Sequence, residues 1–153
     1  MKTNAVRILD SAKIKFKTFE YDFDENALDA VSVATKINAE PEQVFKTLVS
    51  KSDSAFFVFC IPGNFELNLK KAAIAANVKK IEMLPLKELT NVTGYVRGGC
   101  SPIGMKKLFP TFIDETALLF DNIYVSAGIR GMQLFINPND LANIINAKFA
   151  DLI

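Results

Sequence analysis

A glycine-rich stretch at positions 98–102 contains the backbone groups best suited to bind a negatively charged oxygen. Gly98 and Gly99 lack a Cβ atom, so their amide groups can approach a ligand closely and form an anion-binding nest or an oxyanion hole. Pro102 stiffens the end of the loop. The spacing matches neither a P-loop nor a dinucleotide-binding fingerprint. The stretch therefore predicts either an oxyanion-binding loop or a tight structural turn.

Lys46 is a second candidate because it lies within a segment, 44–49, that favours a strand. Side chains alternate along a strand, so Val44 and Leu48 share the face of Lys46 and direct it inward. An inward ammonium group could anchor a carboxyl, carbonyl or phosphate oxygen. A solvated lysine on an edge strand fits the same pattern, so both interpretations stay open.

Ser126 follows an apolar run and precedes two small residues, Ala127 and Gly128, that are typical of a turn. Its hydroxyl group could bind a ligand, although a purely structural turn gives the same pattern. The chain contains no histidine, which excludes Ser-His-Asp and Cys-His catalysis and every metal site with a histidine ligand. Two cysteines are too few for a four-thiolate zinc or iron–sulfur site within one chain. We therefore expect no metal and no cofactor.

The two cysteines differ in their sequence context. Cys60 lies in the apolar segment 55–61 and is expected to be a small core residue. Cys100 lies in the glycine-rich loop, where its thiol would be mostly protonated near the ordinary pKa of about 8.5. We expect both to be free thiols, with a disulfide between them as the less favoured alternative. Cys100 is therefore not predicted to act as a nucleophile.

Helical and strand patterns alternate at short spacing, which predicts a mixed α/β fold with a layered or barrel-like core. Asn4 is positioned to cap a first helix, and 137–138 (Asn-Pro) to open the last one, on which Leu141 and Phe149 share a face. The segment 55–61 is apolar on both faces and predicts a fully buried strand. The other expected strands are 15–21, 44–49, 81–84, 112–114, 123–126 and 132–136, and the other expected helices are 29–37 and 68–76.

The composition indicates one globular domain spanning residues 1–153. Half of the 153 residues are hydrophobic and 23% are charged. The formal charge of +1 gives a weak overall field, so any contact with nucleic acid needs a local basic patch. The longest uncharged stretch, 54–65, is shorter than the ~20 residues that span a bilayer, and the N-terminus lacks the apolar segment of a signal peptide. We therefore expect a cytoplasmic protein that contacts no membrane.

Several motifs, taken in order, resemble one family. They are Lys2-Thr3-Asn4-Ala5, Val44-Phe45-Lys46-Thr47-Leu48-Val49, Thr93-Gly94-Tyr95 with Gly98-Gly99-Cys100-Ser101-Pro102-Ile103-Gly104, and Val125-Ser126-Ala127-Gly128 with Gly131. Over nearly the full length the chain is similar to the YbaK/EbsC family of aminoacyl-tRNA deacylases. The resemblance implies a mixed α/β domain with a curved, barrel-like sheet and flanking helices. It also implies a freestanding relative of the editing domain of bacterial prolyl-tRNA synthetase. In this family the synthetase mischarges tRNA(Pro) with cysteine, and the freestanding deacylase removes that cysteine.

The resemblance implies roles for the residues that match the family's motifs. Lys46 corresponds to the functional lysine, Gly98 begins the Gly-x-x-x-Pro loop that faces the aminoacyl ester, and Ser126 lines the same pocket. Tyr21 is expected to face the pocket, in a region where many relatives carry a histidine that this chain lacks. Some relatives have an acidic residue near Gln133. The further substrate-binding residues that we expect are Cys100, Ser101, Pro102 and Gly128.

The same resemblance implies a substrate-assisted reaction, in which the cysteine thiol of the substrate attacks its own carbonyl and the tRNA 3′ end leaves. The amide groups of Gly98 and Gly99 would stabilise the oxyanion, and Lys46 would hold the aminoacyl-adenosine end. The implied partners are a mischarged tRNA and prolyl-tRNA synthetase, with no DNA. Two alternatives stay open: a deacylase for another mischarged tRNA, such as Ala-tRNA(Pro) or Ser-tRNA, or a module that binds tRNA or a synthetase without catalysis.

Overall fold

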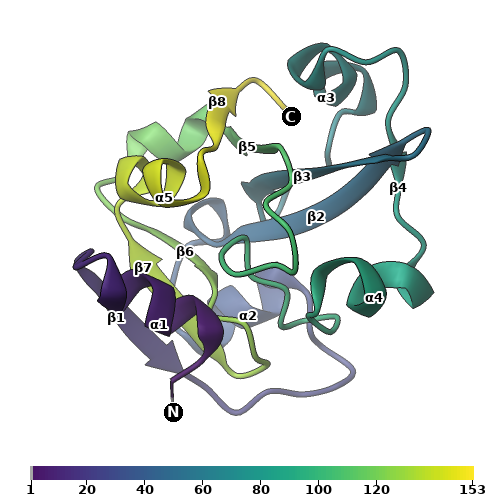
Figure 1. The fold of residues 1–153 in the computed structure, drawn as a ribbon. Coiled ribbons are helices and arrows are strands. Elements are labelled where there is room, and N and C mark those ends of the chain that lie inside the picture. The colour runs from purple at the N-terminus through teal and green to yellow at the C-terminus, as the bar shows by residue number, and fades with distance from the viewer. Residues whose placement is uncertain (1) are drawn as a thin grey trace.

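The computed structural model describes residues 2–153 of the chain (Figure 1). Its strands are β1 (Phe16–Glu20), β2 (Phe45–Ser52), β3 (Ala55–Pro62), β4 (Glu82–Met83), β5 (Thr111–Asp114), β6 (Ile123–Ser126), β7 (Met132–Ile136) and β8 (Lys148–Ala150). Its α-helices are α1 (Asn4–Ser11), α2 (Ala30–Lys36), α3 (Leu69–Ala76), α4 (Leu89–Thr93) and α5 (Pro138–Ile145), and its 3₁₀ segments are η1 (Pro41–Gln43), η2 (Leu86–Glu88) and η3 (Glu115–Leu119). None of these helices has the length and apolar character needed to cross a membrane.

The strands form two open sheets. In the first, β7 lies between β1 and β6 and pairs antiparallel with both. In the second, ordered β4-β2-β3-β5-β8, the β2–β3 hairpin is antiparallel, whereas β5 pairs parallel with β3 and β8. The predicted mixed α/β class is confirmed, but the barrel-like sheet is not. Within residues 2–153 the two sheets meet through one isolated bridge, between Val44 and Tyr124, whereas a barrel needs continuous pairing around a closed ring.

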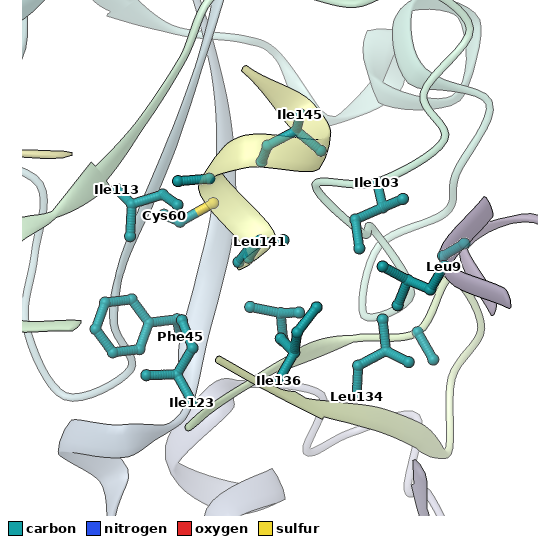
Figure 2. Packing of buried hydrophobic residues seen from close by; sticks show 14 of the residues in the cluster. Leu9, Phe45, Cys60, Ile103, Ile113, Ile123, Leu134, Ile136, Leu141 and Ile145 are labelled. Carbon is teal, nitrogen blue, oxygen red and sulfur yellow. The ribbon is translucent and has the colours of Figure 1, made fainter. Parts of the chain in front are cut away.

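The main hydrophobic core lies between the two sheets and includes side chains from α1 and α5 (Figure 2). Leu9 comes from α1, Leu141 and Ile145 come from α5, and Leu134 and Ile136 come from β7. Burying one such aliphatic side chain is worth about 1.5–3 kcal/mol. This packing therefore holds in place the strands β2, β6 and β7, which carry the residues of the candidate site.

β3 is buried on both faces, as its continuous apolar sequence predicts. Phe59 and Ile61 belong to a second cluster, to which α3 contributes Ala72. Cys60, which points to the opposite face, belongs to the main core. The strand is consequently fixed from both sides, and it delivers the residue that follows it, Gly63, to a defined place.

The first helix begins with a different cap from the one that the sequence suggested. Thr3, rather than Asn4, is the capping residue of α1, because its Oγ1 accepts a hydrogen bond from the Val6 amide at 3.1 Å. The same hydroxyl donates to the carbonyl of Ala127 at 2.6 Å. The cap thus ties the start of α1 to the segment that follows β6.

The last helix is shorter than its apolar pattern predicts. Asn137 caps α5 as expected, but the helix ends at Ile145 because Asn146 adopts a left-handed conformation with a φ of 52°. Phe149 therefore does not lie on the last helix. It lies on β8 and is the parallel partner of Ile113 on β5, because pairing with the free edge of β5 satisfies the backbone there.

Candidate active site

A cavity of about 180 Å³ lies where α2, the start of β2, the glycine-rich loop and the β6–β7 pair meet. It is smaller than the roughly 300–1,000 Å³ of pockets for drug-sized ligands, so it suits the end of a small group rather than a whole nucleotide. Lys46, Gly98 and Ser126, which are far apart in the sequence, line it together. The full lining is Leu28, Asp29, Ala30, Val33, Val44, Phe45, Lys46, Thr47, Gly63, Gly98, Cys100, Ser126 and Gln133.

Lys46 places a partly desolvated ammonium group in this cavity. Its position on β2 is fixed by pairing with Ile61 on β3. The Nζ atom donates to the carbonyl of Gly63 at 3.3 Å, which is long for a hydrogen bond of this type. Burial lowers the pKa of Lys46, and the carboxylates of Glu66 and Asp29 oppose that effect. The ammonium group is therefore weakly partnered and can bind an oxygen of a ligand.

Gly63 is a site residue to which the sequence gave no role. Its amide donates to the carbonyl of Val44 at 2.8 Å, and its own carbonyl accepts from Lys46. A Cβ atom at this position would lie 2.5 Å from the Cβ of Ala30 at the start of α2. Only glycine therefore allows α2 to approach the end of β3 so closely. The sequence marks this residue only as the glycine that interrupts an apolar run.

The glycine-rich loop reaches the cavity through Gly98 and Cys100. Gly98 has a φ of +82° and lies in a turn closed by the Gly99 amide, which donates to the carbonyl of Val96 at 3.0 Å. The Gly99 amide is already bonded, so the expectation that it is free to donate to a ligand is not met. The amides of Gly98 and Cys100 donate to no other group within residues 2–153, which leaves these two as the available donors.

Ser101 and Pro102 shape the loop instead of lining the cavity, which corrects their expected contact with a substrate. Ser101 is fully buried, and its Oγ accepts a hydrogen bond from the Ile103 amide at 3.2 Å. Pro102 lines a separate hollow beside Ile103. The hydroxyl group of Tyr95 donates to the carbonyl of Ile103 at 2.5 Å. These bonds hold the loop in one conformation, as preorganised donors require.

The antiparallel pair β6–β7 places Ser126 and Gln133 opposite each other, and both line the cavity. The Oγ of Ser126 accepts a hydrogen bond from the Gly128 amide at 3.2 Å. Gly128 therefore positions the hydroxyl group but, contrary to expectation, does not line the cavity itself. Gln133 is 5% exposed, and its Oε1 has no hydrogen-bond partner in the part of the chain that the structure describes.

Neither cysteine is prepared to act as a nucleophile. Both are free thiols, as expected. Burial raises the pKa of Cys100 to about 11, although a hydrogen bond with Thr93 opposes the shift. Burial also raises the pKa of Cys60 to about 12. Because the thiolate is the reactive form of cysteine, the raised pKa of Cys100 disfavours it as a nucleophile at neutral pH.

The cavity falls within a region that matches a known protein family. A family model described as the aminoacyl-tRNA editing domain matches residues 24–144, a range that includes every residue lining the cavity. The chain belongs to the aminoacyl-tRNA editing domain family. The resemblance that the motifs around Lys46, Gly98 and Ser126 indicate is therefore confirmed.

Two relatives and a solved structure illustrate the family. A protein of Enterococcus faecalis named "Putative Cys-tRNA(Pro)/Cys-tRNA(Cys) deacylase EbsC" is 47% identical over 152 residues, which cover 99% of this chain and 93% of that protein. The "Proline--tRNA ligase" of Bacillus cytotoxicus is 26% identical over 84% of this chain and 22% of the ligase. A crystal structure of "a putative trans-editing enzyme for prolyl tRNA synthetase" superposes with a TM-score of 0.82 at 23% identity, covering 99% of this chain and 98% of that one. This last similarity shows the shared fold.

One residue expected in the pocket of this editing domain lies outside the cavity. Tyr21 lines a separate hollow together with Phe23, Arg130 and Gly131. Its amide donates to the carbonyl of Gly131 at 2.9 Å, which extends the β1–β7 pairing beyond the end of β1. The structure thus places Tyr21 at a neighbouring hollow, and its contact with a substrate stays a prediction.

The editing domain also has a cavity wall that the sequence did not reveal, formed by the start of α2. Asp29 caps this helix, with its Oδ2 accepting from the Ser32 amide at 3.1 Å and its Oδ1 accepting from the Ser32 hydroxyl at 2.7 Å. These hydrogen bonds, with a smaller effect from Lys46, lower the pKa of Asp29. A helix was predicted at 29–37, but a capping pattern does not indicate what the helix packs against.

Proposed function

We propose that this protein is a trans-editing deacylase that releases cysteine from mischarged Cys-tRNA(Pro). One observation carries the proposal: Lys46, Gly98 and Ser126 line a single small cavity. A cavity of about 180 Å³ suits a cysteinyl group better than a bulky amino acid. The 47% identity to the Enterococcus faecalis protein, whose name gives this activity, supports the substrate class.

In the proposed mechanism the substrate supplies its own nucleophile. The cysteinyl sulfur forms a bond to the carbonyl carbon of its own ester, and the bond from that carbon to the tRNA 3′ oxygen breaks. The thiol proton ends on the departing oxygen, which gives free tRNA and a cysteine thiolactone that water then opens. The raised pKa of Cys100 agrees with this scheme, because the protein offers no thiolate there.

The protein contributes position and electrostatics to this reaction. A nearby ammonium group lowers the pKa of a thiol, so Lys46 favours the reactive thiolate form of the substrate. The amides of Gly98 and Cys100 donate to the oxygen that becomes negative as the sulfur attacks. The hydroxyl group of Ser126 orients the ester. Removal of one donor to an oxyanion typically lowers kcat by about 10²–10³.

The same proposal covers partners and location. The substrate is the 3′ aminoacyl end of a mischarged tRNA, and prolyl-tRNA synthetase is the proposed source of that tRNA. The formal charge of +1 gives the protein little long-range attraction for the body of a tRNA, which supports a role for the synthetase in selecting it. We place the protein, as a single domain of residues 1–153, in the cytoplasm, where aminoacylation takes place.

Release of labelled amino acid from Cys-, Ala- and Pro-tRNA(Pro), measured side by side, tests the proposal. We expect rapid release of cysteine and release of alanine and proline at the uncatalysed rate, because those two side chains carry no thiol. Equal release of alanine would indicate a different editing specificity and water as the nucleophile. Binding of the tRNAs without release of any amino acid would instead indicate a non-catalytic module.

A further inference from the structure

The cavity contains a buried acceptor for which the protein supplies no donor. Gln133 is 5% exposed, and its Oε1 is the only buried side-chain nitrogen or oxygen within residues 2–153 that lacks a hydrogen-bond partner. Buried amide oxygens in folded proteins nearly always accept a hydrogen bond, so an exception at a binding cavity requires an explanation. A donor on the bound substrate provides one.

The neighbouring polar side chains have other partners in the protein, and none of them donates to Gln133 Oε1. Lys46 donates to the carbonyl of Gly63, and the hydroxyl oxygen of Ser126 accepts from the Gly128 amide. The carboxylate of Asp29 accepts two hydrogen bonds from Ser32. A ligand in the cavity that Gln133 lines could therefore complete its hydrogen bonding with a donor of its own.

The aminoacyl end of a tRNA offers three kinds of donor near its ester. The 2′-hydroxyl of the ribose is a neutral donor on the tRNA side of the ester. The cysteinyl thiol is a weak donor. The α-ammonium is a strong, charged donor, so of the three it gains most from an acceptor that has no other partner, whereas the Asp29 carboxylate in the same cavity already holds two hydrogen bonds from Ser32.

We infer that Gln133 Oε1 accepts a hydrogen bond from the α-ammonium of the aminoacyl group, so that the cavity recognises the free amine of its substrate. This inference rests on the proposed function and deepens it. The substrate class becomes aminoacyl esters with an unblocked amine, and peptidyl or formylated esters are poor substrates. Gln133 is therefore a specificity-determining residue.

Two substrates that differ only in the amine test the inference without adding bulk. The first is Cys-tRNA(Pro), and the second is 3-mercaptopropionyl-tRNA(Pro), which keeps the thiol and the ester but lacks the amine. Values of kcat/KM are measured for both with wild type, Gln133→Met and Gln133→Glu. Each is divided by the rate of spontaneous hydrolysis, since the amine also changes the lability of the ester. Circular dichroism and thermal midpoints check that the variants fold.

We expect Gln133→Met to lower the corrected kcat/KM for Cys-tRNA(Pro) by about 10- to 100-fold and to leave that for the amine-free substrate unchanged. Gln133→Glu keeps an acceptor at the same place and should keep the preference for the amine. Equal losses on both substrates, or no loss on either, would overturn the inference.

The wild-type protein alone gives an independent answer, in case the variants do not fold. If it shows no preference between the two substrates after correction, the α-ammonium is not recognised and the inference is wrong. If it releases cysteine with a clear preference for the amine, the inference is supported. If it releases neither acyl group, the proposed function fails, and the inference falls with it.

Discussion

A polar side chain is buried at the end of β5 and another at the cavity beside β7, but only the first has all its hydrogen bonds within the protein. Asp114 is fully buried, and its Oδ2 accepts from the amide and hydroxyl of Thr116 at 3.1 and 2.5 Å. Its Oδ1 accepts from the amide of Leu152 at 2.9 Å. Gln133 has an unpaired Oε1, and Lys46 makes a single long hydrogen bond. The complete hydrogen bonding of buried Asp114 stabilises the fold, whereas the incomplete hydrogen bonding at the cavity can be completed by a ligand.

Lys46→Ala should give the largest effect on activity and little effect on stability. We expect release of cysteine from Cys-tRNA(Pro) to fall by about 10²–10³-fold, since an electrostatic contact to the reacting group is lost. The free energy of unfolding should change by less than about 1 kcal/mol, because Nζ makes only one long hydrogen bond. Single-turnover deacylation and urea unfolding measure the two quantities.

Lys51→Ala is a matched control for this variant, because it removes the same charge from the same strand. Lys51 lies at the far end of β2, opposite Phe56 and Glu82, and does not line the cavity. Its removal should leave the deacylation rate unchanged. Equal losses of deacylation rate in both variants would mean that the overall charge, and not the position of Lys46, determines the rate. Activity of Lys46→Ala close to that of wild type would remove Lys46 from the site.

Asp114→Ala should have the opposite effect, a large loss of stability with little change in the deacylation rate. It removes three hydrogen bonds and leaves the buried amide of Leu152 unpaired, so we expect the free energy of unfolding to fall by about 3 kcal/mol. The rate per folded molecule should stay near that of wild type. Urea unfolding and single-turnover deacylation well below the unfolding transition measure both.

Asp151→Ala is the control for Asp114, since this residue is close to the same C-terminal segment but is exposed. Its ion pair with Lys71 at 3.0 Å should contribute no more than about 1 kcal/mol. A similar loss from both variants would show that charge at the C-terminal segment, rather than the buried hydrogen bonds of Asp114, stabilises it.

The contrast between the two regions also explains which features could be predicted from sequence. β3 was predicted well, since an apolar run determines its own burial on both faces. Phe149 was assigned to the wrong element because the helical spacing continues past Asn146, whereas the pairing of β8 with the distant strand β5 decides the structure. Local patterns predict elements, but they contain little information about which elements become neighbours.

The site shows the same limit. Motif resemblance identified Lys46 and Gly98, which the structure brings to one cavity. It could not separate residues that face the cavity from those that build its walls, so Ser101 was assigned to the substrate although it holds the loop. Gly63 was given no role, and Gln133 was noted only as a position near which some relatives have an acidic residue, because a close approach of α2 and an unpaired oxygen are properties of the packed structure alone.

Gln133→Met should stabilise the protein by about 1 kcal/mol, a smaller change with the opposite sign to that of Asp114→Ala. The variant replaces an unpaired buried oxygen with an apolar group of similar shape, which removes the cost of desolvating that oxygen. Gln43→Met is the control, since Gln43 Nε2 donates to the carbonyl of Asn122 at 2.9 Å and its loss should destabilise. Losses of stability in both variants, measured by urea unfolding, would show that Gln133 is satisfied in solution.

Replacement of Cys100 should have the smallest effect on cysteine release, since this residue lines the cavity without supplying a nucleophile. With a pKa of about 11 in the folded protein, its thiol is protonated near pH 8, so alkylation by iodoacetamide should be slow and should accelerate as the pH approaches that value. The ordinary thiol pKa of the unfolded chain, about 8.5, is lower. Stability should therefore be complete below about pH 8.5 and decline as the pH rises from there toward 11, because the unfolded state loses the proton first.

Peptide mapping separates Cys100 from Cys60, whose pKa of about 12 predicts still slower labelling. Cys100→Ser should reduce the alkaline loss of stability and change cysteine release by a few-fold at most. Rapid labelling of Cys100 at neutral pH, together with an inactive Cys100→Ser protein that folds normally, would show that the protein contributes a thiolate. In that case the cavity would be an ordinary nucleophilic site, and its incomplete hydrogen bonding could no longer be attributed to a substrate that supplies its own sulfur.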